Sequence, residues 1–297
     1  MTPAESTVPV ALFVFNRPDC TARVLARIRD ARPRRLYVIG DGPRPGRADD
    51  AELCANVRDL VSHGVDWPCE VRTELADGNL GCGRRISSGI DWVFGQEPAA
   101  IFLEDDCLPD ATFFPFCAEM LTRYADDPRV GQVCGSPLVA PRLSQPTRYI
   151  FSRYGPVWGW ASWRRAWSGY DLRLGRWPGL REGDWLERVV MSGREARIRR
   201  RIYDDIRSGG IDTWDYQWGF LKFERGLLSV IPTTNLITNI GLGAGGTHRN
   251  TRDAALPAGA MAWPLTGPAE ARPDEAFDRA FSAHIAPSIW QRIVKRL

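Results

Sequence analysis

The sequence predicts an α/β protein built on a mostly parallel sheet that is flanked by helices. Three observations lead to this class: short apolar segments recur in the first half, each ends in a polar loop, and segments with helical spacing separate them. The apolar segments are residues 8–15, 36–39, 69–75 and 100–103. Apolar strands that alternate with helices are typical of a parallel sheet buried on both faces, with right-handed crossovers.

Polar residues follow the expected strands at the points where the strands end. They are Asn16 and Arg17 after the first strand, Asp41 after the second, Asn79 after the third, and Glu104, Asp105 and Asp106 after the fourth. In such sheets, ligands bind at the carboxyl ends of the strands. We therefore expect these side chains to converge on one crevice.

The second half of the chain differs in composition. Eight of the twelve tryptophans lie between residues 153 and 218, and the basic stretch 194–201 is expected to be a helix. Residues 251–273 are rich in alanine and proline, which predicts an extended tail lying over the body. Apolar residues at i+4 spacing from Phe277 to Leu297 predict one or two helices with a single apolar face.

Charge and cysteine content argue against several classes of protein. The 39 basic and 36 acidic residues give a formal charge of +3, which is too balanced to indicate nucleic-acid binding. Seven cysteines without a C-x-x-C pair argue against a disulfide framework or a cysteine zinc site and fit a reducing cytosol. The chain start lacks a secretory pattern, and the best apolar run is far shorter than the ~20 residues of a spanning helix. We expect a cytoplasmic protein whose C-terminal helix packs on the body, on a second subunit of a homodimer, or on the inner face of the cell membrane.

The segment Glu104-Asp105-Asp106 is the strongest chemical signal. Three consecutive carboxylates repel one another, so a cation or hydrogen-bond donors are needed to compensate them. If the segment is extended, Glu104 and Asp106 face one way and Asp105 the other. One or two carboxylates at the edge of a crevice suit Mg²⁺ or Mn²⁺ when substrate phosphates supply the remaining ligands. The alternative is a solvated acidic turn.

The order of these motifs resembles a known family. Phe13-Val14-Phe15-Asn16-Arg17-Pro18, then Asp41-Gly42, then Asn79-Leu80-Gly81, then Phe102-Leu103-Glu104-Asp105-Asp106 is similar to the nucleotide-sugar half of GT-A fold glycosyltransferases. The similarity is to family 2-like bacterial enzymes and to the motifs of animal N-acetylglucosaminyltransferase I, and it spans residues 8–248. It implies a Rossmann-like fold with a nucleotide-sugar half (1–140), an acceptor-binding half (141–250) and a tail with an amphipathic helix (251–297).

The activity that the resemblance implies is inverting, metal-dependent sugar transfer from a nucleotide-diphosphate donor, expected to be UDP-linked, to a hydroxyl acceptor. The expected setting is bacterial glycan, capsule, lipopolysaccharide or natural-product synthesis. In the DXD-type segment, Asp106 would bind Mn²⁺ or Mg²⁺, Asp105 would contact the ribose or the donor sugar, and Glu104 would support that contact. The alternatives are a sugar-1-phosphate nucleotidyltransferase and a non-catalytic binding protein of the same fold.

The resemblance also implies donor contacts outside the acidic segment. Asn16 and Arg17 would lie in the crevice, with Arg17 on the phosphates or the base; alternatively, Arg17 pairs with an acidic neighbour. Asp41 would bind the base or the ribose, or it fixes a turn. Gly81 would let the backbone amides at a helix start approach the nucleotide, or it marks an ordinary helix entry. Arg85 is expected to reach the pyrophosphate.

A second constellation lies at residues 212–218. Inverting transfer needs a base for the acceptor hydroxyl, and the resemblance maps this role onto Asp215. The alternative is that Asp212 or Asp215 caps the helix that runs through residues 220–223. Trp158, Trp160 and Trp214 are expected to stack on the sugars, although core packing is the stronger interpretation for each tryptophan of this region. His248 ends a glycine-rich segment and would be brought to the metal or the diphosphate when that loop closes.

Overall fold

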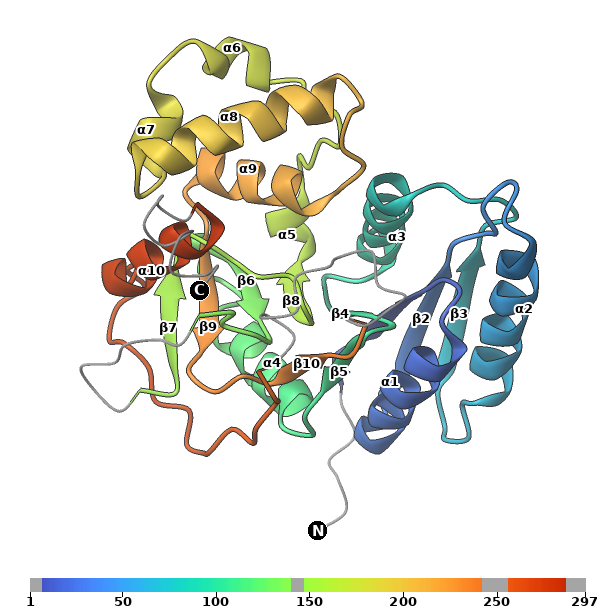
Figure 1. Ribbon diagram of the computed structural model, residues 1–297. Coiled ribbons are helices and arrows are strands. Elements are labelled where there is room, and N and C mark those ends of the chain that lie inside the picture. The colour runs from blue at the N-terminus through green and yellow to red at the C-terminus, as the bar shows by residue number, and fades with distance from the viewer. Residues whose placement is uncertain (1–6, 140–146, 242–255, 287–297) are drawn as a thin grey trace, which may run out of the picture.

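The computed structural model describes residues 7–139, 147–241 and 256–286. A central eight-stranded sheet has the order β3–β2–β1–β4–β8–β6–β9–β7 (Figure 1). Its strands are β1 (Val10–Val14), β2 (Arg35–Gly40), β3 (Glu70–Leu75), β4 (Ala99–Glu104), β6 (Val130–Cys134), β7 (Tyr149–Ser152), β8 (Trp160–Trp163) and β9 (Leu228–Pro232). Strands β5 (Cys107–Pro109) and β10 (Ile237–Asn239) form a separate antiparallel pair.

The four strands expected from the first half of the sequence lie side by side. Strand β1 pairs in parallel with β2 and β4, and β2 pairs in parallel with β3. Strand β8 runs antiparallel between β4 and β6, and β7 runs antiparallel to β9 at the far edge. Strands β6 and β9 are again parallel. The predicted α/β fold with a mostly parallel sheet is confirmed.

Helices cover both faces of this sheet. One face carries α1 (Pro18–Ala31), α2 (Ala48–His63) and α4 (Phe113–Arg123), and the other carries α3 (Cys82–Gln96), α5 (Arg164–Trp167) and α9 (Asp215–Arg225). The side chains of β1 alternate accordingly. Val10, Leu12 and Val14 pack with the first set of helices, while Ala11 and Phe13 pack with the second. The expectation that the central strands are buried on both faces is therefore confirmed.

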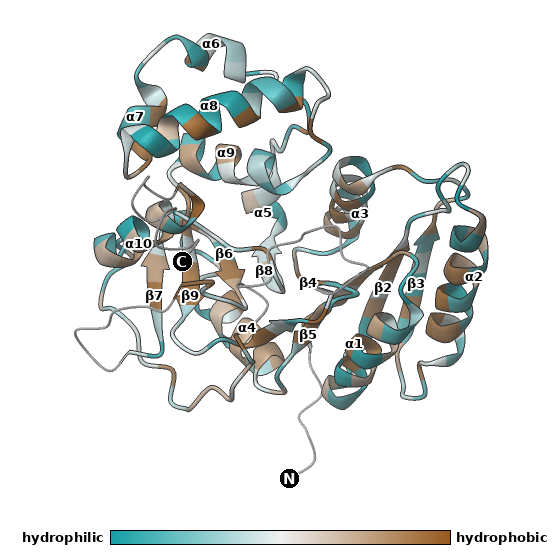
Figure 2. Ribbon diagram, in the orientation of Figure 1, coloured by the Kyte–Doolittle hydropathy of each residue, from teal (hydrophilic) through white to brown (hydrophobic). Residues whose placement is uncertain are grey.

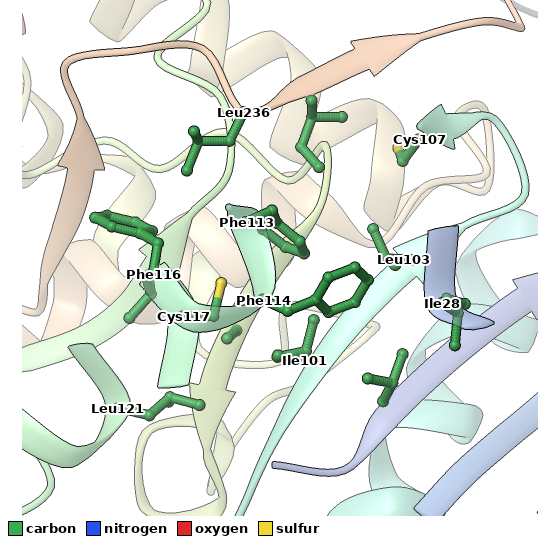
Figure 3. Packing of buried hydrophobic residues seen from close by; sticks show 14 of the residues in the cluster. Ile28, Ile101, Leu103, Cys107, Phe113, Phe114, Phe116, Cys117, Leu121 and Leu236 are labelled. Carbon is green, nitrogen blue, oxygen red and sulfur yellow. The ribbon is translucent and has the colours of Figure 1, made fainter. Parts of the chain in front are cut away.

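The packing around β4 fixes the strand that leads into the acidic segment. Figure 3 shows Phe113 and Phe114 of α4 beside Ile101 and Leu103 of β4, and all four side chains are buried. Because close packing in the core holds this strand in place, Glu104 at its end has a defined position.

Strand β3 differs from the expected unbroken apolar strand. Val71 and Leu75 are exposed, and among the described strands β3 lies at the edge of the sheet beside β2. An edge strand is less enclosed by neighbouring strands and helices than the central strands are. The side chains of β3 are therefore exposed or half-buried, and the strand is less buried than its apolar sequence predicted.

A third group of helices lies above the second face. It consists of α6 (Trp177–Arg181), α7 (Trp185–Val189), α8 (Gly193–Arg207) and part of α9, and α10 (Glu275–Ile285) packs against the same cluster. Helix α8 contains the basic stretch that was predicted to be helical, and Ser192 caps it by accepting a hydrogen bond from the Glu195 amide at 3.2 Å. Figure 2 shows that α8 is mostly hydrophilic, and its residues Ala196, Ile202, Tyr203 and Ile206 pack with this cluster.

The described part of the tail, residues 256–274, runs over the body without a helix. Met261 and Leu265 are buried against the main core, and Pro273 forms a bridge with Phe151 of β7. The predicted extended tail is confirmed for these residues, and α10 confirms the first part of the predicted C-terminal helix. The remainder of that helix lies outside the described residues. No helix within the described ranges is both long and apolar enough to cross a membrane, and the seven cysteines are free.

Candidate functional site

A cleft of about 360 Å³ opens at the carboxyl ends of β1, β2 and β4, next to the first turn of α3. The sequence-predicted residues that line it are Arg17, Asp41, Asn79, Gly81, Arg85, Glu104 and Asp105. Its volume lies within the range of small-molecule sites. The predicted convergence on one crevice is confirmed for Arg17, Asp41, Asn79, Glu104 and Asp105, whereas Asp106 is not among the residues that line the cleft.

Arg17 joins the two aspartates of the acidic segment. Its Nη1 atom donates to Asp106 Oδ2 at 2.9 Å, and its Nη2 atom donates to Asp105 Oδ1. Asp105 also accepts a hydrogen bond from the Phe15 amide at 3.3 Å and is only 2% exposed. The expected alternation of Asp105 and Asp106 is wrong, because β4 ends at Glu104 and the next two residues form a turn that brings both carboxylates to Arg17.

The acidic segment carries more negative charge than its surroundings neutralise. Burial, together with the charges of Asp106 and Asp105, raises the pKa of Glu104 to about 8. Burial also raises the pKa of Asp105 to about 6 even though Arg17 opposes that shift. Among the described residues, Glu104 has no hydrogen-bond partner for its carboxylate. A second cation at this position would stabilise the ionised form of the cluster.

The donor set fits a hard divalent cation only if a substrate completes it. Within the described ranges, no group of three or more His, Cys, Asp or Glu side chains is arranged as a metal site. Asp106 and Asp105 offer carboxylate oxygens, which suit Mg²⁺ or Mn²⁺ in sites where one or two carboxylates combine with phosphate oxygens. In the structure, the guanidinium of Arg17 supplies the positive charge at these oxygens.

Asp41 organises the loop after β3. Its two carboxylate oxygens accept hydrogen bonds from the amides of Gly42, Leu80 and Gly81, at 2.9, 2.8 and 3.2 Å, and from Asn79 Nδ2 at 2.9 Å. These contacts match the alternative in which Asp41 fixes a turn. Asp41 also lines the cleft, and its contact with a base or ribose stays a prediction.

The amides at the start of α3 are not free. Asp212 accepts hydrogen bonds from the amides of Cys82 and Gly83, both at 2.8 Å, so a carboxylate from the second half of the chain caps this helix. Gly81 has φ +82°, and a Cβ atom there would lie 2.5 Å from Asp212 Oδ2. The absence of a side chain at Gly81 thus lets the Asp212 carboxylate approach the start of α3. The sequence had predicted that a nucleotide would approach the backbone at this position.

Arg85 is buried in the cleft wall at 5% exposure. Its Nη2 atom lies 3.0 Å from Glu74 Oε2, while its Nε has no hydrogen-bond partner in the described part of the chain. A buried guanidinium with unused donors in a cleft is suited to an anionic ligand. Arg84, its neighbour in sequence, points to a different pocket.

Asn16 lies outside the cleft lining and supports it. Its amide donates to Asp50 Oδ1 at 2.8 Å, and Asp50 binds Arg44 through Nε at 2.6 Å and Nη2 at 2.9 Å. These donors hold the pKa of Asp50 well below its usual range. Arg44 lines the cleft and lies 5.2 Å from the centroid of the Phe15 ring. Sequence reasoning missed Arg44 and Asp50, because neither belongs to a motif.

Asp215 is the first residue of α9, after the N-cap Trp214, and it accepts a hydrogen bond from Thr213 Oγ1. It does not line the cleft, but it is close enough for its charge to contribute to the raised pKa of Glu104. Its role as a base stays a prediction.

The tryptophans predicted to stack on sugars are core residues here. Trp160 and Trp214 are 2% and 3% exposed, and their rings stack with centroids 5.5 Å apart. Neither lines the cleft, although both border a small space that Glu104 also lines. Their apolar surface helps to desolvate Glu104, which is the main cause of its raised pKa. Trp158 is half-buried and packs against the main core.

Comparisons with known proteins find a distant structural similarity. No family model matches the chain, and no curated protein matches it. Among solved structures, the mannosyltransferase PcManGT from Pyrobaculum calidifontis, in complex with GDP-Man and Mn²⁺, matches with a TM-score of 0.41 and 13% identity, covering 75% of this chain and 70% of that chain. The likeness is to a glycosyltransferase, and at this degree of similarity the function has to be argued from the site's own chemistry.

The glycine-rich segment begins at the acidic cluster. The amide of Ile240 donates to the carbonyl oxygen of Asp106 at 2.8 Å, and a Cβ atom on Gly241 would lie 2.3 Å from Asp106 Oδ2. The chain therefore approaches this carboxylate as closely as a glycine permits. His248 lies outside the described residues.

Proposed function

We propose that this chain is a metal-dependent glycosyltransferase that moves a sugar from a nucleotide-diphosphate donor to a hydroxyl acceptor with inversion. The observation that carries the proposal is the cleft at the strand ends. It places an acidic segment with poorly compensated charge beside two arginines that face the same space. A diphosphate together with a divalent cation would satisfy both kinds of charge at once.

The residues of the cleft suggest a division of labour for donor binding. Asp106, with Asp105 beside it, would hold Mn²⁺ or Mg²⁺, which would neutralise the negative charge of the leaving diphosphate. Arg17 and Arg85 supply positive charge to the diphosphate from the protein side. The loop that Asp41 holds in place would receive the nucleoside, which is proposed to be uridine.

Asp215 is proposed to act on the acceptor. It would accept the proton of the attacking hydroxyl as the new bond to the anomeric carbon forms and the bond to the diphosphate breaks. Thr213, which donates a hydrogen bond to Asp215, orients that carboxylate. In an inverting transfer the base reaches the hydroxyl on the face opposite the leaving group, and Asp215 lies outside the lining of the cleft proposed for the diphosphate.

A thermal-shift series with nucleotide sugars tests the donor half of the proposal. UDP-linked and GDP-linked sugars are added with Mn²⁺, with Mg²⁺ and with chelator, and a metal-dependent rise in melting temperature is expected for the true donor. Asp106→Ala should abolish that rise. Asp205→Ala is the matched control, because Asp205 is exposed on α8 and, within the described residues, its side chain makes no hydrogen bond or ion pair.

Release of nucleoside diphosphate tests the catalytic half. Asp215→Asn should keep the metal-dependent thermal shift but lose at least about 100-fold in turnover, since general-base catalysis contributes roughly 10² to 10⁴. Full turnover in Asp215→Asn would refute the assigned base. Absence of any nucleotide-dependent shift in the wild-type protein would favour a binding protein of the same fold.

A further inference from the structure

A second pocket of about 450 Å³ adjoins the cleft. Its lining residues come from the start of α3, the segment after α5, the end of α8 and the start of α9, and Figure 1 shows α8 and α9 above the sheet. Asp212 lines both this pocket and the cleft, and Thr213 joins the pocket to Asp215 through its hydrogen bond. The pocket thus borders both the proposed donor cleft and the proposed base.

Three arginines with no carboxylate partner line this pocket. Within the described residues, the side chains of Arg84 and Arg173 make no hydrogen bond or ion pair, and Arg207 donates only to the carbonyl oxygens of Arg173 and Leu174, at 3.2 and 3.1 Å. Several other arginines of the same helical region are paired with carboxylates. Among them are Arg176 with Glu224, Arg181 with Asp204, Arg188 with Asp184 and Arg200 with Glu187. The pocket therefore gathers three arginines that lack such a partner among the described residues.

Asp212 does not neutralise these three arginines. Its carboxylate is already bound by the amides of Cys82 and Gly83 at the positive end of α3. With three arginines and one aspartate, the lining keeps a net charge of two positive units. Planar guanidinium groups in such an arrangement favour phosphate or carboxylate ligands.

Gln217 gives the pocket a second, independent polar feature. Its side chain is 2% exposed, and its Nε2 atom donates to the carbonyl oxygens of Leu172 and Thr213, at 3.2 and 2.7 Å. These two bonds fix the orientation of the amide, and Oε1 has no hydrogen-bond partner among the described residues. A buried acceptor without a partner favours a ligand that donates a hydrogen bond, as a hydroxyl does.

We propose that this pocket binds the acceptor, and that the acceptor is an anionic sugar that carries a phosphate or a carboxylate beside its hydroxyls. The inference rests on the proposed function, because the pocket is given a role in the same reaction. The anionic group would lie against Arg84, Arg173 and Arg207, and one hydroxyl would donate to Gln217. Another hydroxyl would attack the anomeric carbon, the bond from that carbon to the diphosphate would break with its electron pair, and the proton would go to Asp215.

Calorimetric titration of the full chain with three probes tests the charge preference. The probes are glucose 6-phosphate, glucuronate and glucose, at one ionic strength. At least one anionic sugar is expected to bind about tenfold or more tightly than glucose, and the two anions separate a phosphate from a carboxylate preference. Equal affinities for all three sugars would overturn the proposal.

Two arginine variants place the binding in this pocket. Arg173→Gln should weaken the preferred anion about threefold to tenfold, and the double variant with Arg207→Gln at least tenfold, while glucose is unaffected. Arg201→Gln is the matched control, since Arg201 is exposed on the same helix as Arg207 and does not line the pocket. The Arg173 side chain makes no hydrogen bond or ion pair with the described residues, so the single variant keeps the test valid if the double variant unfolds.

Adding UDP or GDP with Mn²⁺ separates this inference from the proposed function. The anion is expected to bind equally well with the nucleotide present, and displacement by the nucleotide would show that the probe occupies the donor cleft, which overturns the proposal. Nucleotide binding without any anion preference would overturn the acceptor proposal alone. Anion binding that depends on Arg173, without nucleotide binding, would overturn the donor proposal while the anion pocket stands.

Discussion

Replacing Asp212 with alanine tests the contact that ties the two halves of the chain together. The variant removes a carboxylate that accepts two hydrogen bonds at 2.8 Å from the amides of Cys82 and Gly83. Those amides belong to the first turn of α3 and have no carbonyl partner within the helix. Without Asp212, water must take its place at the wall of the cleft.

The size of the effect follows from the exposure of the contact. Loss of an N-cap side chain costs about 0.5–2 kcal/mol, and loss of the favourable charge at the helix N-terminus adds about 0.3–1 kcal/mol. Asp212 is exposed, so water recovers part of both contributions. We expect the free energy of unfolding to fall by about 1–2 kcal/mol in Asp212→Ala. Asp212→Asn, which keeps one acceptor oxygen, should lose about half as much.

Urea unfolding gives the global cost, and hydrogen exchange read by mass spectrometry gives the local one. Exchange should accelerate in the peptide that contains the amides of Cys82 and Gly83, whereas peptides of β1 should change little. Asp205→Ala removes the same charge from an exposed position of the same half and serves as the control. Equal stability losses in the two variants, or unchanged exchange at the start of α3, would refute the capping role.

Three further predictions concern Gly81, Asp50 and Lys222. Gly81→Ala should cost about 1–3 kcal/mol in urea unfolding because of its positive φ, and part of that cost should vanish in the Asp212→Ala background, where the 2.5 Å approach to the carboxylate is gone. Asp50→Asn should destabilise the protein at pH 7 by about 1–3 kcal/mol; because binding to Arg44 lowers the pKa of Asp50 in the folded state, the difference from wild type should shrink as the pH falls below about 4. Burial lowers the pKa of Lys222 to about 8, so the stability of the wild type should rise between pH 8 and 10.5 relative to Lys222→Met, and parallel pH profiles would contradict this.

The sequence predicted the part of the site that depends on strand ends. Arg17, Asp41 and Glu104 each follow an apolar segment, and parallel strands bring such residues to one edge whatever else surrounds them. The same patterns allowed a turn role for Asp41 and an acidic partner for Arg17 as alternatives, and the structure matches both. They did not identify the partners, because Asp41 binds amides of the loop after β3 and Arg17 joins both aspartates where β4 ends at Glu104.

The tryptophans illustrate the same division. Their concentration in the second half was visible in the sequence, but composition alone does not distinguish a ring that faces a ligand from one that faces the core. Trp160 and Trp214 are buried because β8 inserts between β4 and β6 and α9 covers it. Trp160 and Trp214 affect the cleft by shielding Glu104 from water at the small space that the three residues line.

The sequence by itself determined the fold class, the positions of the first four strands along the chain and the acidic segment at the carboxyl end of the fourth strand. These features depend on residues that are close together in the chain, and the periodicity of apolar residues predicts them. The tertiary structure alone decided that Asp212 caps α3 and that Arg84, Arg173 and Arg207 share a pocket. Those contacts join residues about 30 to 130 positions apart, so they depend on how the helices pack, which no local pattern specifies.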